Sequence, residues 1–335
     1  MSTNTMTEKT VKTEIKRDDA SSLDRTLRPQ TWEEYVGQAK IKENLRILLT
    51  AAKERRHAAE HVLLYGPPGL GKTTLANLVA KTLGTNMKIT SGPAIERVGD
   101  LAAILTNLSP GDVLFIDEIH RLSKSIEEVL YPAMESGVLD IIIGKGPSAR
   151  TVQLELPPFT MVAATTRISL LSSPLRSRFS GGTFRLEFYS EDEIATILKR
   201  SASLLNMKTT DDIVGQIALR CRATPRTANY LLKRCRDLAQ LEGKDLDESI
   251  INKTFGLLEI DTLGLNQPDR SVLEAIINKF KGGPVGLNTI AAATGEESST
   301  IEDVIEPYLI RHGLLERTPR GRIASPLAYT HLERQ

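Results

Sequence analysis

Cysteine is scarce in this sequence. Only Cys221 and Cys235 occur among 335 residues, 14 positions apart, with no CxxC pair and no histidine at ligand spacing. This pattern indicates neither a disulfide framework nor a zinc site. We therefore expect reduced, structural thiols in a cytoplasmic protein.

Long apolar runs are also absent. No stretch approaches the roughly 18 residues that a membrane-spanning helix needs, so we expect no membrane partner. Residues 1–22 are polar and charged rather than typical of a secretory signal peptide. We expect these residues to form a disordered tail.

Excess charge of either sign is missing too. The chain carries 43 Lys and Arg against 42 Asp and Glu, a net charge of +1. Bulk basicity therefore does not indicate a nucleic-acid partner, and any such site must be a local patch. The length exceeds the ~250–300 residues that one core organises, so we expect two or three domains.

Short apolar runs dominate the first half of the chain. A helical stretch at 40–56 precedes them, and further helical segments separate most of them. This alternation is typical of a parallel sheet covered by helices on both faces. The runs that predict strands lie at 61–65, 87–90, 112–117, 159–166 and 184–189.

The strand signal disappears after Tyr189. Ser190 and Glu193 form a capping-box pattern, and helical patterns then continue to about residue 260, which predicts a small all-helical domain. Three further helices are predicted, followed by two short β-capable runs around Pro-Arg-Gly at 319–321. Three helices and a hairpin indicate a winged helix.

The strongest motif is GPPGLGKT at 66–73, which follows a predicted strand and opens a predicted helix. That context is typical of a phosphate-binding loop. Glycines let backbone amides approach phosphate oxygens, and the helix N-terminus favours an anion. We expect Lys72 to reach the β and γ phosphates of ATP and Thr73 to coordinate Mg²⁺.

An acidic pair follows another predicted strand, in DVLFIDEIH at 112–120. Alone, such a pair is commonly a solvated turn. Behind a phosphate loop, we interpret Asp117 as a magnesium ligand and Glu118 as the general base that polarises the attacking water.

Two arginines stand out in SSPLRSRFSGG at 172–182, a stretch with the composition of a loop. No Asp or Glu occurs between Glu155 and Glu187 to pair with Arg176 and Arg178 in sequence. A solvated surface loop is the simplest interpretation. The alternative is that one arginine binds a phosphate on another chain.

Several motifs together resemble the RuvB family, AAA+ motors of Holliday junction branch migration, from about Leu27 to Leu332. The segments that carry the resemblance are GPPGLGKTTLAN, TSGPAIERVGDLAAILTNL, DVLFIDEIHRL, LYPAME, DIIIGKGPSAR, LPPFTMVAATTR, SSPLRSRF and RTPRGR.

This resemblance implies an α/β P-loop AAA+ domain with a parallel sheet, an all-helical lid domain and a C-terminal winged-helix DNA-binding domain. The expected limits of the three domains are residues 23–186, 187–260 and 261–335. The implied function is ATP-driven translocation of duplex DNA by a homohexameric ring in recombination, repair and the SOS response. A RuvA-like junction-binding partner and a RuvC-like resolvase are the implied protein partners.

The resemblance also implies roles for single residues. Thr166 corresponds to the sensor of the γ phosphate, and Arg178 to an arginine finger that enters the neighbouring subunit's site. Arg226 resembles the lid sensor, although Ala223 stands where the family usually has glycine. The implied nucleotide contacts are Leu27, Arg28, Gly69, Gly71, Lys72, Thr73, Thr74, Tyr189 and Arg226.

Two further surfaces follow from the resemblance. The segment 140–156, with Gly144 and Gly146 at its tip, resembles a hairpin that docks on RuvA; a merely structural hairpin is the alternative. Arg317 and Arg322, assisted by Arg320, resemble arginines that contact DNA, where a solvated basic turn is the alternative.

This sequence departs from the family at two places. The segment after the finger, which contains Ser180–Gly182, is one residue longer than is usual in the family and is rich in glycine. This predicts a looser link between the finger and the lid. Ser298 stands where relatives can have a DNA-contacting arginine, and we expect Glu296 and Glu297 to repel the DNA backbone.

Two other functions compete with a DNA motor. A nucleotide-gated winged helix would read an operator, and a clamp-loader relative would act on a protein ring. Intact Lys72, Asp117 and Glu118 favour turnover over sensing, and a clamp loader would not require the basic wing.

Overall fold

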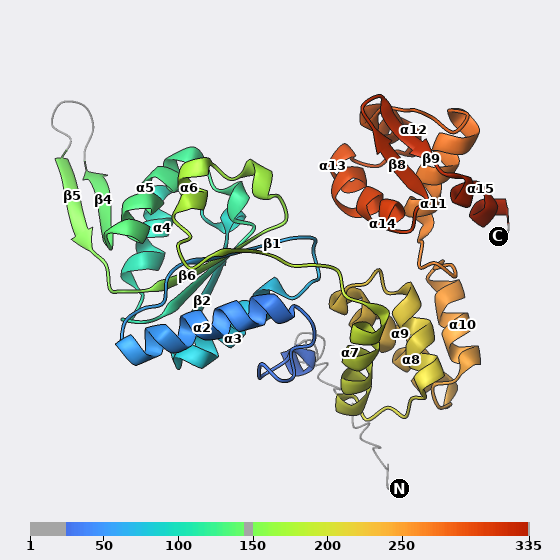
Figure 1. Ribbon diagram of the computed structural model, residues 1–335, viewed down its shortest axis with the longest axis horizontal. Helices are drawn as coiled ribbons and strands as arrows, with labels where there is room; N and C mark the ends of the chain where they lie inside the picture. Colours follow the sequence, from blue (N-terminus) through green and yellow to red (C-terminus); the bar gives the residue numbers. More distant parts are fainter. Residues whose placement is uncertain (1–24, 144–149, 334–335) are drawn as a thin grey trace, which may run out of the picture.

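The computed structural model describes residues 25–143 and 150–333. The expected tail at 1–22, the hairpin tip with Gly144 and Gly146, and the last two residues lie outside the described residues. Figure 1 shows an α/β region at one end and, at the other, a group of helices beside a smaller helix-and-hairpin unit. The predicted fold class, with a parallel sheet, a helical lid and a winged helix, is confirmed.

A five-stranded parallel sheet forms the centre of the first region, with the order β2-β3-β6-β1-β7. The fifth predicted strand is shorter than expected, because the chain leaves the sheet after Arg185. The strands are β1 (Val62–Tyr65), β2 (Met87–Ser91), β3 (Val113–Asp117), β6 (Thr160–Thr165) and β7 (Thr183–Arg185).

Helices cover both faces of this sheet, which explains why its central strands are buried almost throughout. Successive side chains of β3 point to opposite faces: Phe115 packs with α2 and α3, and Leu114 packs with α4 and α5. Figure 1 shows these layers. The helices are α2 (Ala39–Arg55), α3 (Lys72–Leu83), α4 (Val98–Thr106), α5 (Lys124–Glu135), α6 (Ser173–Ser177), η1 (Gly92–Ala94), η2 (Ile119–Arg121) and η4 (Ile168–Leu170).

The segment expected to form a hairpin does so. Strands β4 (Val138–Ile143) and β5 (Arg150–Glu155) pair antiparallel as a separate two-stranded sheet. Leu139 at its base is buried in the core, and most of β5 is exposed. The hairpin lies at the end of the molecule farthest from the lid (Figure 1).

Four helices form the lid, and a side-chain cap begins each of them. At α7 the predicted capping box is present: Glu193 N donates to Ser190 Oγ at 3.2 Å, and Ser190 N donates to Glu193 Oε2 at 2.8 Å. Thr210, Thr224 and Asp247 cap the other three helices. The helices are α7 (Glu191–Leu204), α8 (Asp211–Arg220), α9 (Pro225–Glu242) and α10 (Glu248–Leu257).

The C-terminal unit is a winged helix with a buried apolar core of its own. Its last helix, α15, was not predicted, because its pattern is short and weakly amphipathic. The elements are α11 (Gln267–Glu274) continued by η5 (Ala275–Lys279), α12 (Leu287–Thr294), α13 (Ser298–Thr300) continued by η6 (Ile301–Ile305) and α14 (Glu306–Arg311), β8 (Leu315–Thr318), β9 (Gly321–Ala324) and α15 (Pro326–Glu333).

A buried ion pair holds the wing hairpin to the helices. Arg322 on β9 donates from Nη2 to Glu306 Oε2 at 2.8 Å and from Nε to the same oxygen at 3.1 Å. Both residues are buried. Removing one partner would leave the other charge uncompensated inside the domain, which is costly.

We therefore expect Glu306→Ala to lower the free energy of unfolding of the winged helix by about 3–5 kcal/mol. Glu302→Ala is the matched control, because Glu302 pairs with Arg317 at a half-exposed position and should cost under about 1 kcal/mol. The only tryptophan, Trp32, lies outside this domain. Hydrogen exchange of amides in α14, β8 and β9 is therefore the measurement, and equal effects of the two variants would contradict the prediction.

Candidate nucleotide-binding site

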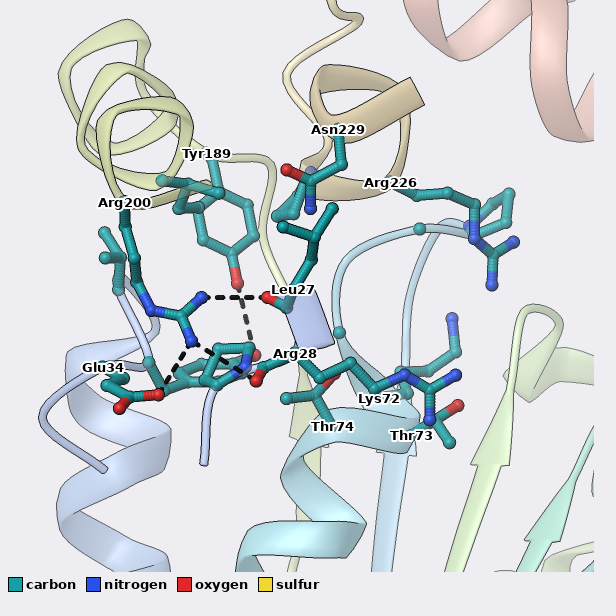
Figure 2. Close-up of a pocket in the computed structure, with 18 of the residues that line it drawn as sticks. Leu27, Arg28, Glu34, Lys72, Thr73, Thr74, Tyr189, Arg200, Arg226 and Asn229 are labelled. Atoms are coloured by element: carbon teal, nitrogen blue, oxygen red, sulfur yellow. Dashed lines mark hydrogen bonds and ion pairs between the residues drawn. The ribbon is translucent and has the colours of Figure 1, made fainter. Parts of the chain in front are cut away.

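A cavity lies where the phosphate loop meets the lid and the segment before α2. Figure 2 shows side chains from these distant parts of the chain turned toward one another. The structure brings the predicted nucleotide contacts to this cavity. The predicted residues that line it are Leu27, Arg28, Gly69, Gly71, Lys72, Thr73, Thr74, Asp117, Glu118, Tyr189 and Arg226.

The phosphate loop connects the end of β1 to the first residue of α3. Gly69 and Gly71 have positive φ angles of 83° and 98°, a conformation that favours glycine. A Cβ atom added at Gly71 would lie 2.9 Å from Tyr35 Oη. Backbone rather than side chains thus lines this part of the cavity, beside a helix N-terminus that favours anions.

Lys72 is the first residue of α3 and is buried. Its Nζ donates to the carbonyl oxygens of Gly66, at 2.7 Å, and Pro67, at 2.9 Å. Burial lowers the pKa of Lys72, while the nearby carboxylates of Glu118 and Asp117 act in the opposite direction. The two carbonyls therefore hold the ammonium group beside the loop, where burial disfavours its charge and the two carboxylates partly offset that effect.

The acidic pair lies at the end of β3. Burial raises the pKa of Asp117, and Glu118 N donates to Asp117 Oδ1 at 3.0 Å. Glu118 adopts a left-handed conformation, with φ of 48°. Both residues line the cavity.

Glu118 has two partners near its carboxylate. Thr166 Oγ1 donates to Glu118 Oε2 at 3.1 Å, so the predicted sensor contacts the predicted base directly. His120 Nδ1 lies 3.1 Å from the same oxygen and 2.9 Å from Thr165 Oγ1. His120 was not identified from the sequence, although it lies within the quoted motif DVLFIDEIH.

Tyr189 also lines the cavity. Its hydroxyl donates to the carbonyl of Leu70 at 3.2 Å and lies 3.2 Å from Tyr35 Oη. Burial raises the pKa of Tyr189 to about 12. The phenol therefore stays protonated and remains a donor at neutral pH.

Arg200 is a second residue that sequence reasoning missed. From lid helix α7 it donates to the carbonyls of Leu27, at 2.9 Å, and Arg28, at 3.3 Å, and to Glu34 Oε2 at 2.8 Å. Figure 2 shows these bonds closing one side of the cavity. No local pattern marks a pair separated by 166 positions in sequence.

Arg178 lies outside this cavity. The stretch expected to be a loop contains the helix α6, and Arg178 follows its last residue. Its guanidinium stacks over the Tyr131 ring at 4.2 Å, and Nη2 lies 3.1 Å from Glu135 Oε1. The absence of an acidic partner in the local sequence was therefore misleading, because α5 supplies one.

The glycines after Arg178 do not form the loose link that the sequence predicted. Gly181 N donates to His61 O at 2.9 Å, and Leu63 N donates to Gly182 O at 3.0 Å. A Cβ atom at Gly181 would lie 2.8 Å from Glu60 O. Close backbone approach at the sheet edge explains the glycine.

The wing arginines do not all face the same environment. Arg317 and Arg320 are exposed at the hairpin, whereas Arg322 is buried with Glu306. Arg322 would have to break this ion pair to reach a phosphate.

Comparison with known proteins accounts for nearly the whole chain. Residues 27–186 match the "Holliday junction DNA helicase RuvB P-loop domain", 189–261 the "RuvB AAA lid domain" and 262–333 the "RuvB C-terminal winged helix domain". The chain belongs to the RuvB family. It is 56% identical, over 97% of its length and 93% of the relative's, to the "Holliday junction branch migration complex subunit RuvB" of Dehalococcoides mccartyi.

Solved structures agree with this assignment. The "RuvB Holliday junction branch migration motor" of Thermotoga maritima matches with a TM-score of 0.84 and 48% identity, over 92% of this chain and 98% of the other. A mutant of that protein matches with a TM-score of 0.84 and 49% identity, over the same shares. The chain therefore carries a nucleotide-binding AAA+ ATPase domain and a winged helix. Among the helices described, none is long and apolar enough to cross a membrane.

We expect Gly71→Ala to weaken nucleotide binding by about five- to 150-fold, since a left-handed non-glycine residue in this loop costs roughly 1–3 kcal/mol. The added methyl group would also press on Tyr35. Gly84→Ala at the other end of α3 is the control, with φ of 73° but no atom within 4 Å of the added Cβ. Titration with a fluorescent ATP analogue measures both, and equal affinities of the two variants would contradict the prediction.

Proposed function

We propose that this chain is an ATP-driven DNA translocase that moves Holliday junctions in homologous recombination and repair. The observation that carries the proposal is one cavity that joins a phosphate loop, an acidic pair with its threonine and a lid arginine, in a chain that also holds a winged helix. The names of its relatives support the same substrate. In this view, hydrolysis drives movement of duplex arms.

Nucleotide chemistry is assigned to residues of the cavity. Thr73 and Asp117 would hold Mg²⁺ together with the phosphates. Mg²⁺ is usually bound through one or two protein ligands together with phosphate oxygens and water. The ion would neutralise charge on the phosphates when bound. Glu118 would accept the proton of the attacking water, and Thr166 would orient that carboxylate.

Arg178 is assigned to a neighbouring subunit's cavity. It lies outside the cavity of its own chain, yet Tyr131 and Glu135 hold its guanidinium in a fixed orientation. Six identical chains in a closed ring would place each such arginine beside the next nucleotide. An arginine supplied in trans couples hydrolysis to the position of the neighbour.

We expect Arg178→Ala to retain nucleotide binding and to lose turnover by a factor on the order of 10³–10⁵. Arg176→Ala is the matched control, because Arg176 is exposed two positions away. ATPase assays on mixtures provide the second test. Mixing Arg178→Ala with Glu118→Gln should restore some activity, since some interfaces then combine an intact arginine with an intact base. Normal turnover of Arg178→Ala alone would refute the trans assignment.

DNA binding is assigned to the exposed wing arginines Arg317 and Arg320. A translocase must tolerate every sequence, so contacts to phosphates suit it better than contacts to bases. Arg322 was included in this surface by the sequence resemblance, and its buried pair with Glu306 favours a role in holding the wing. Ser298 contributes no charge there.

We expect Arg317→Ala and Arg320→Ala each to weaken duplex binding equally for unrelated sequences and to reduce the salt slope by about 1. Arg46→Ala on α2 of the ATPase domain removes the same charge far from the wing and serves as the control. Binding isotherms at several salt concentrations measure the slope. A strong preference for one DNA sequence would instead support an operator-reading module.

Assembly and partners complete the proposal. The hairpin at 140–156 is proposed as the surface that binds a RuvA-like protein, and a RuvC-like resolvase would act on the same junction. We keep the domain limits at 23–186, 187–260 and 261–335, and we place the protein in the cytoplasm and the SOS response. The deciding experiment measures ATP-dependent unwinding of a synthetic four-way junction with and without a RuvA partner. ATP hydrolysis without unwinding under both conditions would favour a clamp-loader-like role.

A further inference from the structure

An ion pair joins the segment directly after β6, beside the sensor threonine, to the winged helix. Arg167, directly after Thr166, donates from Nε to Asp303 Oδ2 at 2.6 Å, and Nη2 binds the same oxygen. Asp303 belongs to η6, 136 positions later in the chain. About a third of each side chain is exposed, so the pair is neither a buried fold contact nor a free surface pair.

A series of short contacts leads from the backbone of Arg167 to Glu118. Arg167 N donates to Thr165 Oγ1 at 3.0 Å. Thr165 Oγ1 contacts His120 Nδ1 at 2.9 Å, and His120 lies 3.1 Å from Glu118 Oε2. The position of Arg167 therefore bears on both neighbours of the carboxylate, His120 and Thr166.

The same segment of the winged helix also contacts the lid. Arg222 Nη2 donates to the carbonyl of Val304 at 2.9 Å, and the Arg222 guanidinium stacks over Tyr308 at 4.3 Å. Arg222 lies four residues before Arg226, which lines the cavity. η6 therefore contacts two parts of the chain that lead to the nucleotide site. One is the segment beside Thr166 and Glu118, and the other is the lid segment before Arg226.

The charges near Arg167 explain why its partner matters. The hydrogen bond with Asp303 is the main cause that raises the pKa of Arg167, and the charges of Glu302 and Glu118 act in the same direction. Asp303 and Glu118 both attract this guanidinium. If Asp303 were removed, less attraction would oppose the movement of Arg167 toward Glu118. An arginine drawn to Glu118 would compete for the carboxylate that must accept a proton.

We propose that Asp303 is a positioning residue for ATP hydrolysis: it holds Arg167, and through Arg167 it keeps Thr166, His120 and Glu118 in their productive arrangement. A residue of the DNA-binding domain thereby supports the catalytic carboxylate. A change in the orientation of the winged helix on DNA would reach the site through this contact. The inference rests on the proposed ATPase function.

The first test is Asp303→Asn in the full chain, with turnover and nucleotide affinity measured separately in the absence of DNA. We expect kcat to fall by about ten- to a hundredfold, the size typical of lost positioning, while the dissociation constant for ATP changes less than about twofold. Glu302→Gln is the control. It removes an equal charge one residue away that forms no hydrogen bond with Arg167 and acts on it only through a weaker charge interaction, and it should retain normal turnover.

A charge exchange separates this contact from a general structural role. Arg167→Asp alone should be as slow as Asp303→Asn, and the double variant Arg167→Asp with Asp303→Arg should recover a substantial part of the turnover. Normal turnover of Asp303→Asn would overturn the inference. A folded double variant, checked by its thermal midpoint, that stays as slow as the single variants would also overturn it. A wild-type chain that hydrolyses no ATP with DNA and a RuvA partner would instead refute the proposed function.

Discussion

The nucleotide site depends on one backbone turn, the phosphate loop between β1 and α3. Left-handed glycines let the chain reverse there without side chains entering the cavity. The rear of the loop is held by two buried phenols, since the hydroxyls of Tyr35 and Tyr189 both donate to the carbonyl of Leu70. Burial raises the pKa of both phenols, so the donors persist over the physiological pH range.

These two tyrosines also show how the cavity is assembled. Tyr35 comes from the segment before α2, and Tyr189 from the link between sheet and lid. Arg200 ties a lid helix to the carbonyls of Leu27 and Arg28. The lid core and one face of the sheet belong to a single buried apolar cluster. The phosphate loop therefore depends only on residues close together in the sequence. The walls of the cavity around it form only when the lid packs against the sheet.

Sequence reasoning succeeded where the determining interactions are local. The phosphate loop, the buried strands and the Ser190–Glu193 capping box each depend on residues a few positions apart, and each is present. Thr166 and Arg226 were located by motif, and the structure places one beside Glu118 and the other at the cavity.

Contacts between residues that are distant in sequence were not predicted. The pairing of Arg178 with Glu135, of Arg322 with Glu306 and of Arg200 with Glu34 depends on how helices pack, which no local pattern encodes. The glycines at Ser180–Gly182 suggested looseness because composition was the only information available. Backbone approach at the sheet edge gives them the opposite role.

The ion pairs of this chain divide into two kinds by burial. Glu306 and Arg322 are enclosed, so separating them would leave a charge without solvent or partner, and the contact persists as long as the domain is folded. Arg167 and Asp303 remain about one-third exposed, and water can replace either partner at low cost. A contact of this kind adds little to stability, yet it can form and break while both domains stay folded. Such reversibility is what a link between DNA binding and hydrolysis requires, because a motor must change the relation of its domains in every cycle without unfolding either of them.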